Sequence, residues 1–248
     1  MLSANTYSPL LRETAKRLLP DAVRRLLGSV VCRLAHWNAV IRLALFRTRA
    51  VSKNSGSVVT FKNYGVRIND GPNFYTLYKD IFENRIYHFD AQRPDPLILD
   101  CGSNIGMSIL YYKQEHPSAR IVGFEPEPVI FRYLQDNMTR NGISDVCLVP
   151  AAVAGREGNL AFHSDGKYAS YLVQDPSTPV PLGWTECRVP CVRLRSYLIE
   201  PVDFLKLNIE GAEWEAIADA EDHLRQIREM VIEYHHLPGL PRTLHKIL

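Results

Sequence analysis

The segment from Leu97 to Ser108 constrains the fold of this chain more than any other part of it. An apolar stretch ends in the acidic Asp100, and two glycines, Gly102 and Gly106, lie between that residue and a helical pattern. A second short apolar stretch delivers Glu125, 25 positions after Asp100. This order predicts a βαβ unit with a ligand-binding turn at the carboxyl end of its first strand.

The rest of the chain continues the alternation of strands and helices. Such alternation is typical of a parallel sheet joined by right-handed crossovers. We therefore predict an α/β fold, a Rossmann-like parallel sheet with helices on both faces. Its strands are predicted at 97–100, 120–124, 146–150, 204–209 and 229–234, and its helices at 107–116, 129–141 and 212–226. Further strand pieces are predicted at 151–163 and 186–192, with a loop at 164–183.

The N-terminal part differs from the rest in charge. Residues 1–50 carry nine Lys and Arg against two acids, whereas the remainder of the chain is net negative. We predict a basic helical extension over 1–50, a lead-in over 51–95 and a main domain over 96–248. Within the extension we predict two or three helices in 9–48. Within the lead-in we predict a linker at 51–57, a strand at 57–68, a turn at 69–73 and a short helix at 75–84.

Composition limits which cellular compartment and which kinds of partner we expect for this chain. The chain is 46% hydrophobic and 23% charged, which is ordinary for a globular protein. Its longest apolar run, 26–46, contains Arg33, His36 and Arg42, so it is a poor membrane span. That run is either a helix on a membrane surface or a helix packed against protein. Five cysteines without a CxxC pair favour a reduced, cytoplasmic compartment and no metal site. The negative main domain argues against nucleic-acid binding.

The turn chemistry points to a cofactor without phosphate. Neither a G-x-G-x-x-G turn nor a phosphate-binding loop ending in Gly-Lys-Ser/Thr occurs near residue 100. S-adenosylmethionine has no phosphate but has two ribose hydroxyls, which a carboxylate such as Glu125 can bind. The alternative is that Asp100 and Glu125 are ordinary polar residues at strand ends.

A third polar group follows the strand predicted at 204–209. Asn208, Glu210 and Glu213 come at its end, and open α/β sheets bind ligands at that edge. Glu210 is the carboxylate that we expect to face the reacting centre. Glu213 is expected instead to stabilise a helix N-terminus through the helix dipole.

Three segments together resemble the FkbM family of S-adenosylmethionine-dependent methyltransferases. They are Leu-Ile-Leu-Asp-Cys-Gly-Ser-Asn-Ile-Gly at 97–106, Phe-Glu-Pro at 124–126 and Leu-Lys-Leu-Asn-Ile-Glu-Gly-Ala-Glu at 205–213, and the resemblance covers about 75–236. It implies a class I methyltransferase sheet, S-adenosylmethionine as cofactor and O-methylation of hydroxyls on sugars, glycans or natural products. The cofactor contacts that it implies are Asp100, Gly102, Ser103, Asn104, Gly106, Glu125 and Pro126.

The chain departs from this family in three respects. Asn208 stands where the family usually has Asp, and Leu-Arg-Ser-Tyr-Leu at 194–198 replaces its Leu-Asp-x-x-Leu. Only 12 residues follow His236, so we expect the helix and antiparallel strand pair that complete such a fold to be missing. We therefore expect either a partial chain or another chain, in an oligomer, that covers the exposed sheet edge.

Two functions follow from these patterns. The first is an O-methyltransferase in which Glu210, His235 and Asn208 lie at the transfer site, with Glu210 or His235 as the base. The second is an inactive methyltransferase-like protein that keeps the pocket for binding or as a scaffold. The expected partner is a small-molecule or glycan hydroxyl acceptor, and peripheral membrane contact through residues 1–50 is compatible with either function.

Overall fold

The computed structural model describes residues 43–165, 170–173 and 179–235. The chain divides into two compact units, Met1–Arg49 and Ala50–Leu248. Residues 43–49, the described part of the first unit, are helical, and the other helices predicted within 9–48 lie outside the described residues. None of the helices in the described segments combines the length and the hydropathy that a membrane span requires.

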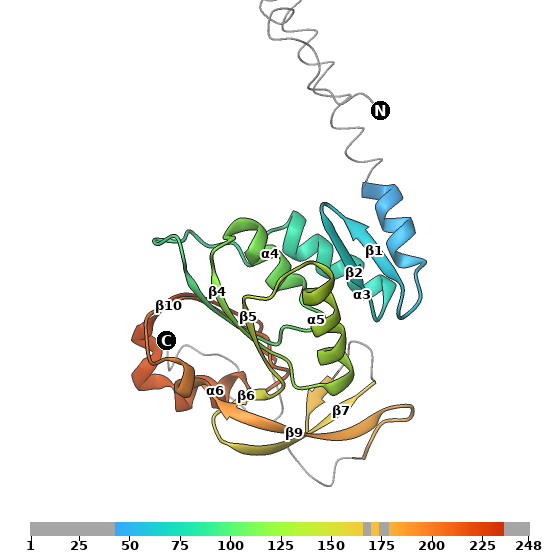
Figure 1. Ribbon diagram of the computed structural model, residues 1–248. Helices are drawn as coiled ribbons and strands as arrows, with labels where there is room; N and C mark the ends of the chain where they lie inside the picture. Colours follow the sequence, from blue (N-terminus) through green and yellow to red (C-terminus); the bar gives the residue numbers. More distant parts are fainter. Residues whose placement is uncertain (1–42, 166–169, 174–178, 236–248) are drawn as a thin grey trace, which may run out of the picture. The chain divides into compact units, whose positions relative to one another are not determined.

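Five parallel strands form the central sheet of the described chain (Figure 1). They are β3 (Leu97–Cys101), β4 (Arg120–Phe124), β5 (Val146–Val149), β10 (Val202–Leu207) and β11 (Ile227–Ile232). Their order is β11-β10-β3-β4-β5, so the chain builds outward from β3 in one direction and from β10 in the other. The reversal between β3 and β10 is where such sheets bind ligands, and the predicted Rossmann-like α/β fold is confirmed.

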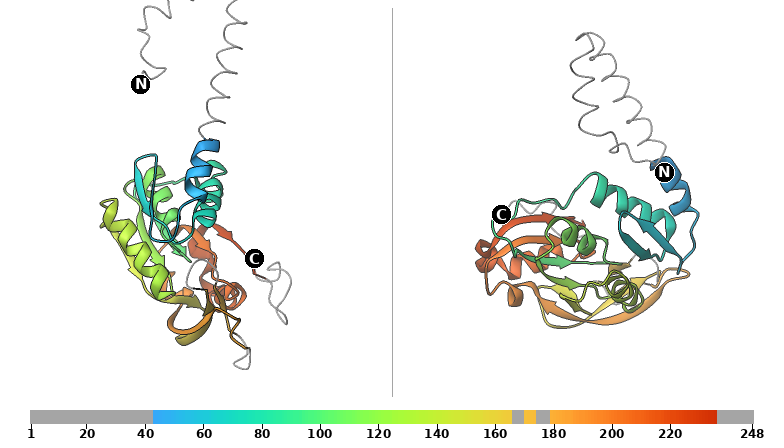
Figure 2. Two further views of the ribbon diagram at one scale, coloured as in Figure 1. Left: turned by 90° about the vertical axis from the view of Figure 1, so that its right-hand side faces the viewer. Right: turned by 45° about the horizontal axis from the view of Figure 1, so that its top comes forward.

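Helices cover both faces of this sheet (Figures 1 and 2). On one face lie α4 (Met107–Glu115) and α5 (Pro128–Arg140), and the Tyr112 ring of α4 packs 5.8 Å from the Phe204 ring of β10. On the other face, Ala216 of α6 (Glu213–Asp219) joins a cluster with Leu205 of β10. Neighbouring residues of a strand point to opposite faces, so β10 is buried on both sides.

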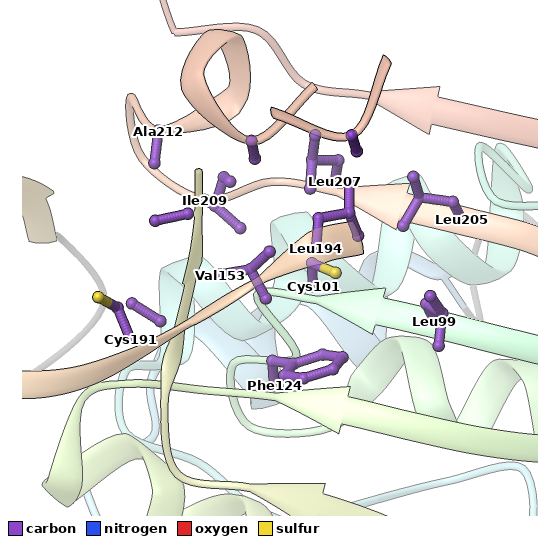
Figure 3. Close-up of a cluster of buried hydrophobic side chains, with 14 of the residues drawn as sticks. Leu99, Cys101, Phe124, Val153, Cys191, Leu194, Leu205, Leu207, Ile209 and Ala212 are labelled. Carbon is purple, nitrogen blue, oxygen red and sulfur yellow. The ribbon is translucent and has the colours of Figure 1, made fainter. Parts of the chain in front are cut away.

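A second sheet packs on the face that α6 covers. Its strands are β6 (Ala152–Ala154), β7 (Gly158–Ser164), β8 (Ser170–Leu172) and β9 (Thr185–Arg193), in the order β6-β9-β7-β8. Leu99, Cys101, Val153 and Cys191 meet in the core between the two sheets (Figure 3). The strand pieces predicted at 151–163 and 186–192 are therefore confirmed. The loop predicted at 164–183 is wrong at Ser170–Leu172, which pairs with β7, while 166–169 and 174–178 lie outside the described residues.

The lead-in contains a hairpin where one strand was predicted. β1 (Val58–Phe61) and β2 (Tyr64–Arg67) pair antiparallel across a two-residue turn. Lys62 in that turn has a φ of +47°, a left-handed conformation that reverses the chain. The prediction of a single strand over 57–68 was wrong because the alternation of side chains continues through the turn without a glycine.

The helix of the lead-in begins earlier than predicted. α3 spans Gly71–Tyr78 because Asp70 caps it, its carboxylate accepting a hydrogen bond from the Asn73 N–H at 2.7 Å. The residues predicted as a turn at 69–73 are thus the cap and first turn of a helix. The helix continues as a π-helix, η1 (Lys79–Glu83). Such widened turns are frequent at functional sites.

Two 3₁₀ segments complete the described elements. η2 (Leu194–Tyr197) connects β9 to β10. The helix predicted over 212–226 is divided, since α6 ends at Asp219 and η3 (Glu221–Gln226) follows it. β11 pairs with β10 and has no second neighbouring strand within the described residues.

Candidate functional site

A cleft of about 870 Å³, including its open mouth, lies at the carboxyl edge of the central sheet. Its lining comes from the residues that follow β3, β4 and β10, together with α3, η1 and β7. The cleft is located at the strand reversal, where the sheet topology predicts a ligand.

Most of the residues predicted from the sequence meet in this cleft. Those that line it are Gly102, Ser103, Asn104, Glu125, Pro126, Asn208 and Glu210. Asp100, Gly106 and His235 are not among the lining residues and contact the site through other residues. The assignment of each as a cofactor or catalytic residue stays a prediction.

Glu125 is fixed by the backbone around it. It is 7% exposed, and its two carboxylate oxygens accept hydrogen bonds from the N–H groups of Asn104 at 2.9 Å and Glu127 at 3.0 Å. Burial raises the pKa of Glu125 to about 7, although both N–H groups lower it. Each oxygen keeps a further lone pair, so the carboxylate can still accept hydrogen bonds from ligand hydroxyls.

Asp100 lies behind the cleft and is paired there. It is fully buried, with one oxygen 3.1 Å from the Lys206 ammonium and the other accepting a hydrogen bond from the Ser108 hydroxyl at 2.6 Å. Lys206 lines the cleft and also donates to the Gly102 carbonyl. Burial lowers the pKa of Lys206, but the Asp100 charge outweighs this and leaves that pKa above its ordinary value. Asp100 therefore acts on the site through Lys206 and the turn.

The two glycines are required by protein contacts. Gly102 has a φ of +86°, and a Cβ there would lie 1.9 Å from the Asn208 carbonyl oxygen. Gly106 has a φ of +91°, and a Cβ there would come within 2.8 Å of Leu134 and 2.6 Å of Met138. We expected both glycines to admit a ligand. The structure adds a second reason for each, the close approach of the segment after β10 at Gly102 and of α5 side chains at Gly106, and Gly102 also lines the cleft.

Glu210 faces the cleft and His235 lies behind it. Glu210 has a φ of +58°, which is unusual for a residue with a side chain. Burial raises the pKa of Glu210, although the neighbouring imidazole of His235 lowers it. The Glu210 carboxylate is 3.7 Å from Nε2 of His235, and Nδ1 of the same ring is 2.9 Å from the carboxylate of Glu213. Glu213 itself is fully buried.

Asn208 presents an amide to the cleft. Its Nδ2 donates to the Glu233 carboxylate at 2.7 Å, and its backbone N–H donates to the Cys101 carbonyl. Its Oδ1 is buried and accepts no hydrogen bond from the residues that the structure describes. A buried acceptor of this kind is costly unless a ligand or water donates to it.

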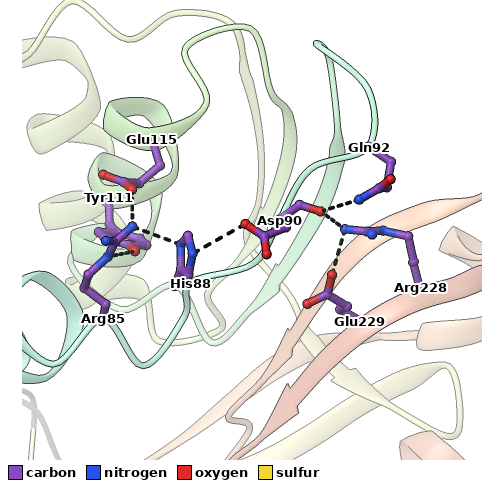
Figure 4. A network of polar contacts seen from close by, with 8 residues as sticks. All are labelled: Arg85, His88, Asp90, Gln92, Tyr111, Glu115, Arg228 and Glu229. Atoms are coloured by element: carbon purple, nitrogen blue, oxygen red, sulfur yellow. Dashed lines mark hydrogen bonds and ion pairs between the residues drawn. The ribbon is translucent and has the colours of Figure 1, made fainter.

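The sequence reasoning missed Lys206 and Tyr87. Tyr87 is 5% exposed, lines the cleft and places its ring 5.5 Å from the Lys206 ammonium. Ion pairs and hydrogen bonds of residues around Tyr87 hold its segment between α4 and β11 (Figure 4). Arg85 pairs with Glu115 at 2.6 Å and contacts Nδ1 of His88 at 3.0 Å. Lys206 was not predicted because it lies within a mostly apolar strand, β10. Tyr87 was not predicted because it lies in a loop, where the sequence shows no periodic pattern.

The charges of the cleft favour a cationic ligand. Glu125, Glu127 and Glu210 line it, whereas the charge of Lys206 is balanced by Asp100. Across the described segments, no group of three His, Cys, Asp or Glu side chains is arranged to hold a metal ion. The carboxylate oxygens that line the cleft therefore suit a ligand with positive charge and hydroxyl donors.

Comparisons with known proteins agree on one family. A family model described as methyltransferase FkbM domain matches residues 100–248. The 31-O-demethyl-FK506 methyltransferase FkbM of Streptomyces tacrolimicus is 29% identical over 195 residues, which cover 66% of this chain and 75% of that protein. The 2-O-methyltransferase NoeI of Sinorhizobium fredii is 26% identical over 159 residues, or 58% of this chain and 65% of that protein.

A solved structure is similar over a smaller part of its own length. The methyltransferase FkbM of Methylobacillus flagellatus is 17% identical, with a TM-score of 0.41. The match covers 60% of this chain but 34% of that one.

Proposed function

This chain belongs to the FkbM family of methyltransferases, and from that premise we propose that it is an S-adenosylmethionine-dependent O-methyltransferase. The observation that carries the proposal is the buried Glu125 at the end of β4, held in place by two backbone N–H groups. The names of two relatives, a 2-O-methyltransferase and a methyltransferase of 31-O-demethyl-FK506, support transfer to oxygen.

The residues that line the cleft fit S-adenosylmethionine by the hydrogen-bond acceptors that they offer. The carboxylate of Glu125 would accept hydrogen bonds from the ribose hydroxyls, and the Oδ1 of Asn208 is free to accept one from an ammonium or hydroxyl group. Phe124 and Ile130 supply apolar surface beside Glu125 that would contact the adenine ring of the cofactor. The bound cofactor would supply an electrophilic methyl group on a sulfonium.

The chain's own contribution is to position an acceptor and to take its proton. Glu210 lines the cleft, and burial raises its pKa toward the range in which a carboxylate is an effective base. We propose that the Glu210 carboxylate accepts the proton of the acceptor hydroxyl. The hydroxyl oxygen loses this proton as it gains the methyl group. Holding the reactants in line supplies much of the remaining acceleration.

The acceptor is proposed to be a neutral hydroxyl compound of the sugar, glycan or natural-product class. Three carboxylates line the cleft, and its single lysine is already paired. An acceptor with a phosphate or carboxylate near its hydroxyl would meet like charge there. Leu77, Ile81 and Phe162 add apolar wall on the side of the cleft formed by α3, η1 and β7.

Isothermal titration with S-adenosylmethionine and S-adenosylhomocysteine tests the pocket. We expect micromolar binding by the wild-type chain, lost in Glu125→Ala and retained in Glu157→Ala, whose side chain is exposed. Equal affinity in all three chains would overturn the role of Glu125. An acceptor screen then tests transfer, where Glu210→Gln should bind cofactor but lose turnover. Cofactor binding without turnover of any acceptor by the wild type would favour a binding protein.

A further inference from the structure

A single buried carboxylate, that of Glu213, connects the groups behind the cleft. It accepts hydrogen bonds from the N–H of Ile209 at 3.1 Å and from the N–H of Gly211 at 3.1 and 3.2 Å. It also contacts Nδ1 of His235 at 2.9 Å and the N–H of that residue at 3.4 Å. Its partners thus come from the loop after β10 and from the segment after β11.

These contacts determine the protonation of both partners. Burial raises the pKa of Glu213, but the hydrogen bonds from His235 and Gly211 outweigh it and leave that pKa below its ordinary value. An ionised carboxylate accepts only, so Nδ1 of His235 must carry a proton. Nε2 of the ring is then the atom directed at the Glu210 carboxylate, 3.7 Å away.

The same carboxylate also holds the backbone that carries Glu210. The residues on either side of Glu210, Ile209 and Gly211, donate their N–H groups to Glu213. Between them Glu210 has a φ of +58°, and a left-handed residue with a side chain persists only where its surroundings hold it. Glu213 therefore controls both the loop position and the charged neighbour of Glu210.

A helix-dipole effect does not account for this arrangement. Glu213 and Glu215 both lie in the first turn of α6 and would share that effect. Glu215 is part-exposed and approaches Arg156 at 3.6 Å, and among the described residues it makes no hydrogen bond or ion pair with the loop or with His235. The buried pair is specific to Glu213.

We propose that Glu213 and His235 are positioning residues that hold the Glu210 carboxylate against the cleft, and that His235 acts through Glu210 instead of taking the acceptor's proton itself. The inference rests on the proposed function for the role of Glu210. Two other charges face this group, the Glu233 carboxylate beside His235 and the Lys206 ammonium beside Glu210. Within the part of the chain that the structure describes, neither of them makes a hydrogen bond or ion pair with Glu213.

Nitrogen NMR of the histidine side chains tests the pair without any substrate. In the wild-type chain the signal of His235, identified by its loss in His235→Asn, should titrate above the ordinary histidine pKa and keep Nδ1 protonated at high pH. The isosteric Glu213→Gln should shift this titration to lower pH and mix the two tautomers. The control Glu215→Gln should leave it unchanged. An unchanged titration and tautomer in Glu213→Gln would overturn the proposal.

A second measurement remains informative if Glu213→Gln does not fold. His235 is part-exposed, so we expect His235→Asn to remove the imidazole and still fold. Carbon NMR of labelled glutamates, with Glu210 identified by Glu210→Gln, should then show the Glu210 titration moving to higher pH in His235→Asn. No movement would contradict the coupling of His235 to Glu210.

Titration with S-adenosylhomocysteine separates this inference from the proposed function. Glu213→Gln and Glu215→Gln should both bind it within about threefold of the wild-type affinity, since neither residue lines the cleft. If the wild-type chain binds no cofactor but shows the expected His235 titration, the proposed function is refuted. The positioning role of Glu213 and His235 toward Glu210 is then not refuted. A tenfold loss of affinity in Glu213→Gln alone would show that Glu213 supports the cofactor site, contrary to the proposal.

Discussion

Three glutamates near one cleft have different acidities because their surroundings differ. Burial raises the pKa of Glu125 to about 7, and burial also raises that of Glu210. Glu213 is fully buried, yet hydrogen bonds from His235 and from the backbone lower its pKa. The direction of each shift follows from the balance between burial and the donors and charges around the carboxylate, and it distinguishes Glu213, the proposed positioning residue, from Glu125 and Glu210.

Cofactor binding should depend on pH through Glu125. With a pKa of about 7, this carboxylate is largely protonated at pH 6 and largely ionised at pH 8. Only the ionised form offers both oxygens to hydroxyl donors, so affinity for S-adenosylhomocysteine should rise about tenfold over this range. Isothermal titration at several pH values measures the effect. Glu125→Gln should abolish the dependence, and a flat profile in the wild type would count against it.

The Asp100–Lys206 pair should be costly to break from one side. Both side chains are buried, so Lys206→Met leaves Asp100 without its cation. We expect a loss of about 3–5 kcal/mol in the free energy of unfolding, measured with urea. Adding Asp100→Asn should recover most of this loss, because no buried charge is then left. A double variant as unstable as Lys206→Met would exclude the ion pair as the cause.

At the scale of elements, the strands of the parallel sheet were predictable and the lead-in was not. The runs in β3 and β10 are mostly apolar because both faces of these strands are buried along their whole length, and this feature stands out in a sequence. The cap at Asp70 and the turn at Lys62 depend on local geometry that their residue types permit but do not require. The split of the predicted helix into α6 and η3 likewise left no signal in the sequence.

The turn after β3 should tolerate no side chain at Gly102. Gly102→Ala adds a Cβ 1.9 Å from a backbone oxygen of the segment after β10, which cannot rotate away. We expect it to lower the free energy of unfolding by more than about 3 kcal/mol. Gly142→Ala is the matched control, since its φ is +67° but no atom lies within 4 Å of the added Cβ. It should cost about 1–2 kcal/mol in urea denaturation; similar costs for the two would disprove the backbone contact.

At the scale of the molecule, the cleft is built from distant parts of one unit. The strand ends that the sequence indicated, near 100, 125 and 208, do meet there, because parallel strands bring their carboxyl ends to one edge. Lys206 and Tyr87 could not be found in this way. The importance of Lys206 depends on a partner 106 positions away in sequence, and that of Tyr87 on where a loop passes.

Residues 50–248 should bind cofactor without the N-terminal unit. Every residue that lines the cleft belongs to the unit Ala50–Leu248. A chain that begins at Ala50 should therefore bind S-adenosylhomocysteine within about threefold of the full chain. Isothermal titration of the two chains side by side, with circular dichroism to verify folding, measures this. A folded short chain with much weaker binding would show that residues 1–49 support the site.

The contact between Gly102 and the Asn208 carbonyl has a consequence for engineering this enzyme. The two loops that flank the proposed cofactor site and the proposed base approach each other backbone to backbone, so we expect that neither can be lengthened or reshaped without displacing the other. Variants that change acceptor preference should accordingly be sought on the opposite wall, at Leu77, Ile81 and Phe162. Substitutions there alter the shape offered to an acceptor while the machinery behind the strand ends stays intact.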